Sequence, residues 1–185
     1  MTDGSRIANL VLRPLQVLLV LIATALIGNV RQTTLDHKDA SYRSDNSAAL
    51  NFSLFVCALA WIVALGGLAA QFFFKTLAAP LSKVLDPLAI LFTFIAAVVL
   101  SAKLKATDCA NAPSHAQKHH GWIASLLSKD NRPIRAEGNC RDIQGGLVFL
   151  WFLFAAFCLS YFLFLNEWRK TRGAFTRPSM SQIGV

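Results

Sequence analysis

The chain has 185 residues, of which 55% are hydrophobic and only 15% are charged. Soluble domains carry about 25% charged residues, so this sequence has too little polar surface to cover a soluble globule. Its formal net charge is +8, but in so apolar a chain basic residues typically flank membrane spans, where they meet water or anionic lipid. Nucleic-acid binding is therefore not expected.

Four apolar stretches are long enough to cross a bilayer, because a helix needs about 20 apolar residues to span a hydrocarbon core of about 30 Å. The second and fourth lack the polar positions at a 3.6-residue period that mark a helix on a soluble protein. The sequence predicts an all-α, four-helix transmembrane bundle over residues 1–172 and a short cytosolic tail over residues 173–185. The four predicted spans are residues 11–30, 48–74, 84–104 and 145–165.

The first stretch also resembles a secretory signal peptide. Arg6 and Arg13 precede an apolar core, and Ala23-Thr24-Ala25 looks like a small-residue cleavage site. Because the apolar run continues past that site to Val30, we expect this segment to be retained as a helix.

Small residues four positions apart let transmembrane helices approach closely. We expect them to pack helices within the bundle, and the same faces would also serve contacts between copies or with another membrane protein. These positions are Thr24 with Gly28, Ala60 with Ala64, and Gly66 with Ala70.

Asp86 lies beside Pro87 and close to Lys83, at the predicted start of the third span. An acid at a helix start caps the helix and complements its dipole, whereas an ionisable residue inside a membrane is a functional candidate. We favour capping, because Asp86 stands at this probable helix start and no second buried carboxylate, basic residue or histidine is expected to form a relay with it. The tight connection predicted over residues 75–83 contains Pro80.

The long polar loop at residues 106–144 holds two cysteines, Cys109 and Cys140, near its ends. A disulfide between them would close the base of the loop and would require an oxidising, extracellular side; the alternative is two free thiols in a cytosolic loop. We favour the disulfide. Cys57 and Cys158 lie inside spans, where thiols behave as small hydrophobes.

Two further features of this loop are ambiguous. Its three histidines, His115, His119 and His120, lack the recognisable four-ligand spacing of a structural zinc site, so we expect them to be solvated and expect no metal. The segment 119–129 is either an interfacial helix among lipid headgroups or packs on the end of the bundle. Its apolar residues at helical spacing are Trp122, Ile123, Leu126 and Leu127.

An even number of spans puts both termini on one side of the membrane. Loop charges decide weakly which side this is; the cysteine pair and the basic run after the fourth span favour cytosolic termini. In that orientation Arg169, Lys170 and Arg172 would bind anionic lipid of the inner leaflet.

Several sequence elements match those of known four-span proteins. They are Leu50–Phe55, Phe92-Thr93-Phe94, Cys140-Arg141 with Gln144, Val148–Phe152, and Gly173-Ala174-Phe175. By these elements the chain is similar to MARVEL-type proteins and, more closely, to the fungal non-classical export protein 2 family. That resemblance implies a multi-pass protein of the fungal plasma membrane that organises lateral domains, including eisosome-associated furrows.

The function expected from these features is non-enzymatic, since no residue pattern indicates catalysis. The expected partners are membrane lipids, further copies of the chain, or other membrane proteins. No cofactor is expected, although the spans leave room for a bound phospholipid, sphingolipid or sterol. An accessory or regulatory subunit of a larger membrane complex such as an ion pump is the alternative, followed by a small channel.

Overall fold

The computed structural model describes residues 3–35, 43–73, 75–104 and 133–175, and each of these segments is an α-helix. In chain order they are α1 (Asp3–Leu35), α2 (Arg43–Phe73), α3 (Lys75–Leu104) and α6 (Pro133–Phe175). Each helix contains one apolar stretch long enough to cross a membrane. The candidate spans are Leu10–Gln32, Ala48–Ala70, Val84–Lys103 and Gly138–Arg169. The predicted all-helical chain with four membrane-spanning helices is confirmed.

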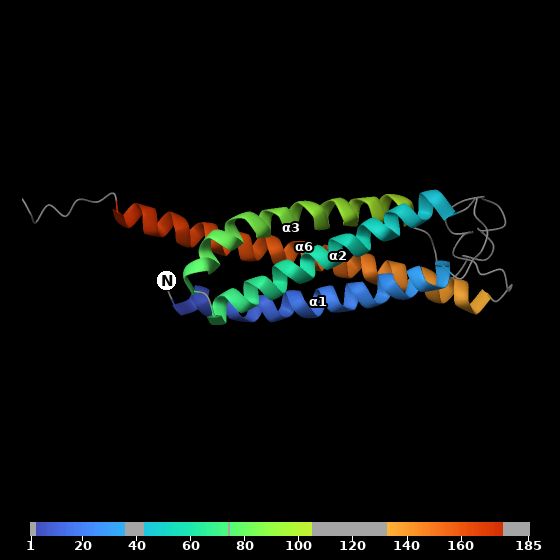
Figure 1. Ribbon diagram of the computed structural model, residues 1–185, viewed down its shortest axis with the longest axis horizontal. Helices are drawn as coiled ribbons and strands as arrows, with labels where there is room; N and C mark the ends of the chain where they lie inside the picture. Colours follow the sequence, from blue (N-terminus) through green and yellow to red (C-terminus); the bar gives the residue numbers. More distant parts are fainter. Residues whose placement is uncertain (1–2, 36–42, 74, 105–132, 176–185) are drawn as a thin grey trace, which may run out of the picture.

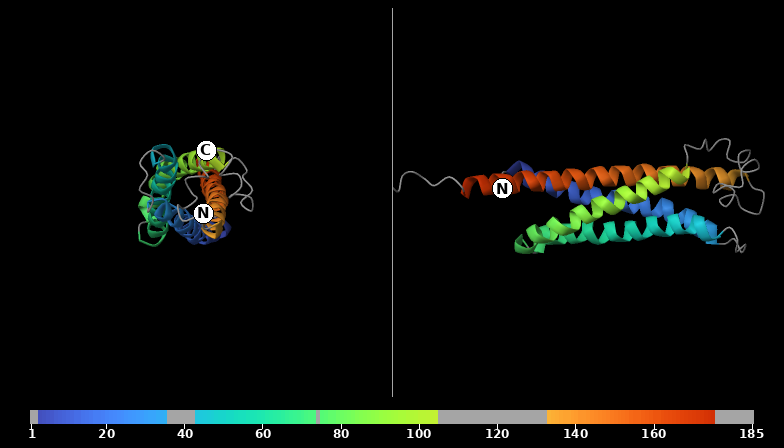
Figure 2. Two further views of the ribbon diagram at one scale, coloured as in Figure 1. Left: turned by 90° about the vertical axis from the view of Figure 1, so that its right-hand side faces the viewer. Right: turned by 90° about the horizontal axis from the view of Figure 1, so that it is seen from above.

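The four helices form an elongated bundle in which successive helices run in opposite directions (Figure 1). The starts of α1 and α3 and the ends of α2 and α6 lie at one end, here called the hairpin end because α2 and α3 connect there. Around the bundle, α1 packs against α2, α2 against α3, α3 against α6, and α6 against α1. The view along the long axis in Figure 2 shows this square arrangement, so α1 and α3 lie on a diagonal.

Every helix begins before its predicted span, and α1 and α6 also end after theirs. The apolar pattern marks only the part of a helix that lies in hydrocarbon, and a helix continues beyond it as long as its backbone hydrogen bonds remain satisfied. The largest consequence is at α3, which begins at Lys75. The tight connection predicted over residues 75–83 is therefore helix instead, and Pro80 lies within it.

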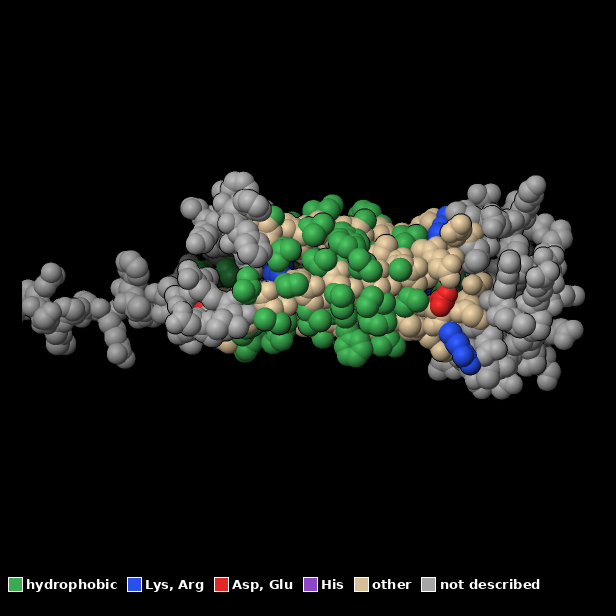
Figure 3. Space-filling view, turned by 90° about the horizontal axis from the view of Figure 1, so that it is seen from below, with side chains coloured by type: hydrophobic (Ala, Val, Ile, Leu, Met, Phe, Trp, Pro, Cys, Tyr) green, Lys and Arg blue, Asp and Glu red, His purple; other side chains and the backbone are tan. Residues whose placement is uncertain are grey.

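The bundle core combines branched aliphatic side chains with small ones. Val20 and Ile27 of α1, Leu153 and Phe157 of α6, and alanines such as Ala96 of α3 are fully buried. The outer surface is apolar as well: on the face shown in Figure 3, hydrophobic side chains form a broad band across the middle of the described part, and charged side chains lie toward its ends. An apolar exterior of this kind matches lipid as the solvent.

Candidate functional site: a buried ion pair across the bundle

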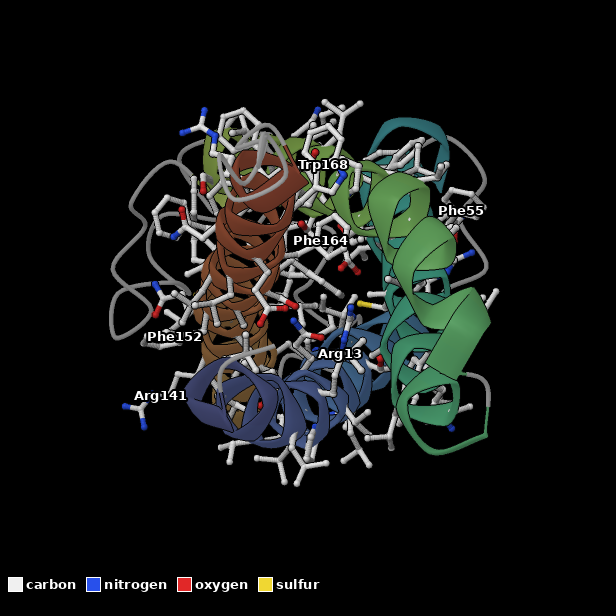
Figure 4. All side chains as sticks on the ribbon, turned by 90° about the vertical axis from the view of Figure 1, so that its left-hand side faces the viewer. Arg13, Phe55, Arg141, Phe152, Phe164 and Trp168 are labelled. Atoms are coloured by element: carbon white, nitrogen blue, oxygen red, sulfur yellow. The ribbon has the colours of Figure 1, made fainter. Side chains whose placement is uncertain are left out.

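Arg13 of α1 and Asp86 of α3 form a buried ion pair. Nη1 of Arg13 donates to Oδ1 of Asp86 at 3.0 Å, and Nη2 donates to Oδ2 at 2.7 Å. The two side chains are only 4% and 2% exposed. Viewed from the hairpin end, Arg13 extends from α1 toward the space enclosed by the helices (Figure 4). Because α1 and α3 lie on a diagonal, this bidentate contact crosses the centre of the bundle.

Gln16, one turn beyond Arg13 on α1, connects the ion pair to α6. Its Oε1 accepts a hydrogen bond from Arg13 Nη1 at 3.2 Å, and its Nε2 donates to the backbone carbonyl of Ala156 at 3.1 Å. The Gln16 side chain is fully buried. Its amide is therefore satisfied on both sides, by the guanidinium and by a carbonyl of the neighbouring helix.

Gly67 of α2 makes room for the Arg13 guanidinium on the remaining side. A Cβ atom at position 67 would lie only 2.6 Å from Cζ of Arg13, closer than real Cβ contacts allow. The guanidinium therefore packs directly against the backbone of α2. Residues from all four helices meet here, and we refer to Arg13, Gln16, Gly67 and Asp86, with the Ala156 carbonyl, as the Arg13 cluster.

The Arg13 cluster lies inside the apolar part of the bundle. Arg13 is three residues inside the first candidate span and Asp86 two residues inside the third. A charge at such a place is costly unless it is paired and its remaining polar atoms are bonded. Here both carboxylate oxygens accept a guanidinium N–H, so each of the two opposite charges is compensated by the other. The hydrogen bonds of the Arg13 cluster thus connect α1 to α3 and to α6 at this level.

The predicted capping role of Asp86 is wrong. The helix that contains it begins at Lys75, eleven residues earlier, so Asp86 is too far inside α3 to cap it. The expectation that the spans hold no second buried ionisable group is also wrong, because Arg13 is buried and pairs with Asp86. The sequence did hold a signal: the first and third spans of an alternating bundle run in the same direction, and each carries one charge, of opposite sign, just inside its start.

A second polar contact links α1 and α2 farther along the bundle. Nε1 of Trp61 donates to Oγ1 of Thr24 at 3.2 Å, and the Thr24 hydroxyl donates to the carbonyl of Val20 at 2.6 Å. The buried hydroxyls of Ser53 and Thr93 likewise donate to the carbonyl four residues earlier on their own helix. Within the described part of the chain, no group of three His, Cys, Asp or Glu side chains could hold a metal ion.

The predicted small packing positions differ in their surroundings. Ala60, Ala64 and Ala70 are buried, and Thr24 makes the contact with Trp61. A Cβ atom at Gly28 or Gly66, in contrast, would meet no other atom within 4 Å. Tight packing occurs at other glycines: besides Gly67, a Cβ at Gly146 of α6 would lie 2.9 Å from side-chain atom Cγ1 of Ile27 of α1. At both glycines a side chain of α1 packs against the backbone of a neighbouring helix, and neither position belongs to the predicted four-residue repeat.

The remaining predicted sites are only partly within the described residues. Arg169 is exposed near the end of α6, while the side chains of Lys170 and Arg172 lie outside the described part. Cys140 is 2% exposed and takes part in a disulfide. Its pairing with Cys109 stays a prediction, because Cys109 lies outside the described residues. The three loop histidines also lie outside the described residues, as does segment 119–129 with Trp122, Ile123, Leu126 and Leu127.

The fold and the paired charges in its interior define a multi-pass helical membrane protein. A family model, the MARVEL membrane-associating domain, matches residues 6–163, which include the Arg13 cluster, three complete spans and most of the fourth. The chain belongs to the MARVEL family. Comparison with curated proteins and with solved structures gives no match.

Proposed function

We propose that this protein is a non-enzymatic organiser of the plasma membrane, acting through the contacts that its helices make with lipids and with other membrane proteins. The observation that carries the proposal is the distribution of apolar and polar groups. Large hydrophobic side chains are exposed on all four helices, whereas the charges of the Arg13 cluster are paired inside the bundle. The exposed set includes Leu18, Leu21, Phe55, Ile62, Leu91, Val98, Phe152 and Phe162.

The Arg13 cluster favours this role over a small channel. A water-filled path along the bundle axis would have to pass the Arg13–Asp86 ion pair, which crosses the diagonal and is nearly inaccessible to solvent. Gln16 and the backbone at Gly67 pack against the same guanidinium. Opening this layer would separate two buried charges, which is costly in a low-dielectric interior.

The finer assignment follows from the resemblance to the fungal non-classical export protein 2 family. We extend the proposal to lateral domains of the fungal plasma membrane, eisosome-associated furrows among them. MARVEL membership supports an activity at a membrane, and the named family adds the kind of domain that is organised.

The end of α6 supplies the lipid contact. Trp168 near the end of the fourth candidate span is 38% exposed, and tryptophan is enriched at headgroup level. Arg169 beside it is exposed. With Lys170 and Arg172 the sequence places three basic residues within four positions. If the termini are cytosolic, these residues would meet the anionic inner leaflet, each contributing about 1 kcal/mol.

This proposal is tested by replacing Arg169, Lys170 and Arg172 with glutamine together. The purified protein, held in nanodiscs of neutral lipid, is mixed with phosphatidylserine liposomes. We expect binding to weaken by up to roughly 100-fold, which corresponds to about 3 kcal/mol, and the difference to shrink with added salt. Lys103→Gln, an exposed change at the opposite end of the bundle, should leave binding nearly unchanged. Equal binding by the triple variant would remove the lipid-binding part of the proposal.

The alternative role, an accessory subunit of a larger complex, is distinguished from the organiser by whether a partner protein purifies with the chain at a fixed ratio. Purification in mild detergent together with one partner at a fixed ratio would favour a subunit of a larger complex. Patches that depend on lipid composition, without a fixed partner, would favour the organiser.

A further inference from the structure

Three aromatic side chains form a cluster on the outer face shared by α3 and α6. The ring centroids of Phe94 and Trp151 are 6.1 Å apart, those of Phe94 and Phe154 are 5.5 Å apart, and those of Trp151 and Phe154 are 6.0 Å apart. Phe94 and Trp151 are 43% and 38% exposed, so the cluster is part of the outer surface. We call this surface the Trp151 face.

The Trp151 face lies midway along the candidate membrane spans. Gln16 contacts Ala156, and Ile27 lies against Gly146, so position 151 of α6 is level with about residue 21 of α1. That residue is the midpoint of the candidate span Leu10–Gln32. The Arg13–Asp86 contact independently places Phe94 at the same level. Residue 21 lies eight residues after Arg13 on α1, and Phe94 lies eight residues after Asp86 on α3, which runs in the same direction.

The indole N–H of Trp151 donates to no acceptor among the described residues, and its position makes this costly. Trp61, at similar depth, donates its indole N–H to Thr24 at 3.2 Å. Tryptophan in membrane proteins is normally concentrated at the interfaces, where its N–H reaches polar groups. At the midplane, lipid chains offer no acceptor, and an unsatisfied donor in hydrocarbon is unfavourable.

We infer that the Trp151 face is a docking surface for a transmembrane helix of a different protein, which presents a hydrogen-bond acceptor to the Trp151 indole at the bilayer midplane. The acceptor is a hydroxyl or amide side chain, because only a polypeptide places such a group at that depth. Phe94 and Phe154 supply the apolar contact around it. This inference rests on the proposed function and deepens it by naming a class of protein partner.

A second copy of the chain fits this face poorly. A two-fold symmetric contact would place the Trp151 face against itself, and its exposed neighbours, Val98 and Val148, are hydrocarbon like the two phenylalanines. Two indole donors would then meet without a side-chain acceptor. We therefore place the hydroxyl or amide acceptor on a different sequence.

The probe is a synthetic transmembrane peptide of leucine and alanine with one asparagine at its centre, compared with the same peptide carrying leucine there. The full chain is placed in nanodiscs with ¹⁵N-labelled tryptophan; its four tryptophans give four indole resonances. We expect the asparagine peptide to move the Trp151 resonance and to bind about 3- to 20-fold more tightly than the leucine peptide. Trp151→Phe, which keeps an aromatic ring in the cluster, should abolish this preference, whereas Trp61→Phe should retain it.

Three results would overturn the inference. The first is an unmoved Trp151 resonance with equal binding of both peptides, and the second is a preference that persists in Trp151→Phe. The third is a Trp151 shift that grows with protein concentration in the absence of peptide, which would show that a second copy supplies the acceptor. None of these results depends on anionic lipid, so failure here is distinct from failure of the liposome experiment.

Discussion

Arg13 and Asp86 join two helices that otherwise reach each other mainly through their neighbours. α1 and α3 lie on a diagonal of the bundle and each packs against α2 and α6, yet the Arg13 guanidinium spans the centre to bind both oxygens of Asp86, the shorter contact being 2.7 Å. Gln16 extends the contact to the Ala156 carbonyl of α6. One arginine thus depends on the positions of all four helices.

Removing one partner of this ion pair should destabilise the bundle strongly. In Asp86→Ala the Arg13 guanidinium stays buried without its carboxylate, which typically costs about 3–5 kcal/mol. The free energy of unfolding, measured by denaturant titration in detergent micelles, should fall by that order. Lys103→Gln, which changes an exposed charge, should alter it by less than about 0.5 kcal/mol.

Removing both charges together should be tolerated better. In the double variant Arg13→Met with Asp86→Leu no unpaired charge is left, and apolar replacements of buried ion pairs are often neutral or stabilising. We expect the double variant to unfold at higher denaturant concentration than Asp86→Ala. If it is no more stable than that single variant, pairing of the two charges is not what stabilises the bundle here.

Gly67 and Gly66 provide a matched pair of positions. A Cβ at position 67 would collide with Arg13, whereas one at position 66 would meet nothing within 4 Å. Gly67→Ala should therefore lower the free energy of unfolding by about 1–3 kcal/mol, as for an overpacked core. Gly66→Ala should raise it by about 0.5–1 kcal/mol, because alanine favours the helix. Equal effects of the two changes in thermal unfolding experiments would contradict the packing of Arg13 against α2.

The number of spans could be predicted because lipid imposes a simple requirement: about 20 apolar residues must follow one another. The start of α3 could not be predicted, since residues 75–83 precede the candidate span and need not be apolar. The partnership of Arg13 and Asp86 was missed, although each of the two spans carries one charge just inside its start. A charge a few residues inside a span looks the same in sequence whether it reaches out to the interface or pairs in the core.

The choice between Gly66 and Gly67 shows a second limit. Successive residues on an α-helix point about 100° apart, so two adjacent glycines face different surroundings. Both residues are glycine, and only the packing of α2 against α1 decides which of them contacts the Arg13 guanidinium. The four-residue spacing of small residues carries no information on that rotation.

The contact between Trp61 and Thr24 should contribute a modest, measurable coupling. Its donor–acceptor distance is 3.2 Å, and hydrogen bonds between transmembrane helices contribute about 0.6 kcal/mol on average and up to about 1.7 kcal/mol. A double-mutant cycle with Trp61→Phe and Thr24→Val in the unfolding titration should give a coupling energy within that range. Strictly additive effects of the two changes would show that the hydrogen bond adds nothing to stability.

The cysteine chemistry can be tested by counting thiols. Cys57 and Cys158 are free and Cys140 is in a disulfide, so the unreduced protein, once unfolded, should react with two equivalents of a maleimide. Prior reduction should raise the count to the four cysteines of the sequence. Mass spectrometry of unreduced peptides should then join Cys140 to Cys109. Four reactive thiols before reduction would remove the disulfide and, with it, the main argument that the loop between α3 and α6 is extracellular.

Loss of this disulfide should also destabilise the fold. The predicted bond between Cys109 and Cys140 closes a loop of about 30 residues, for which the chain-entropy model gives roughly 3–4 kcal/mol. Cys109→Ser should therefore unfold at lower denaturant concentration than the parent under oxidising conditions. Adding a reductant should bring the parent close to the variant, because both then have open loops. If the two proteins already unfold together without reductant, the loop is not held by this bond, and the orientation must be established by glycosylation or protease mapping instead.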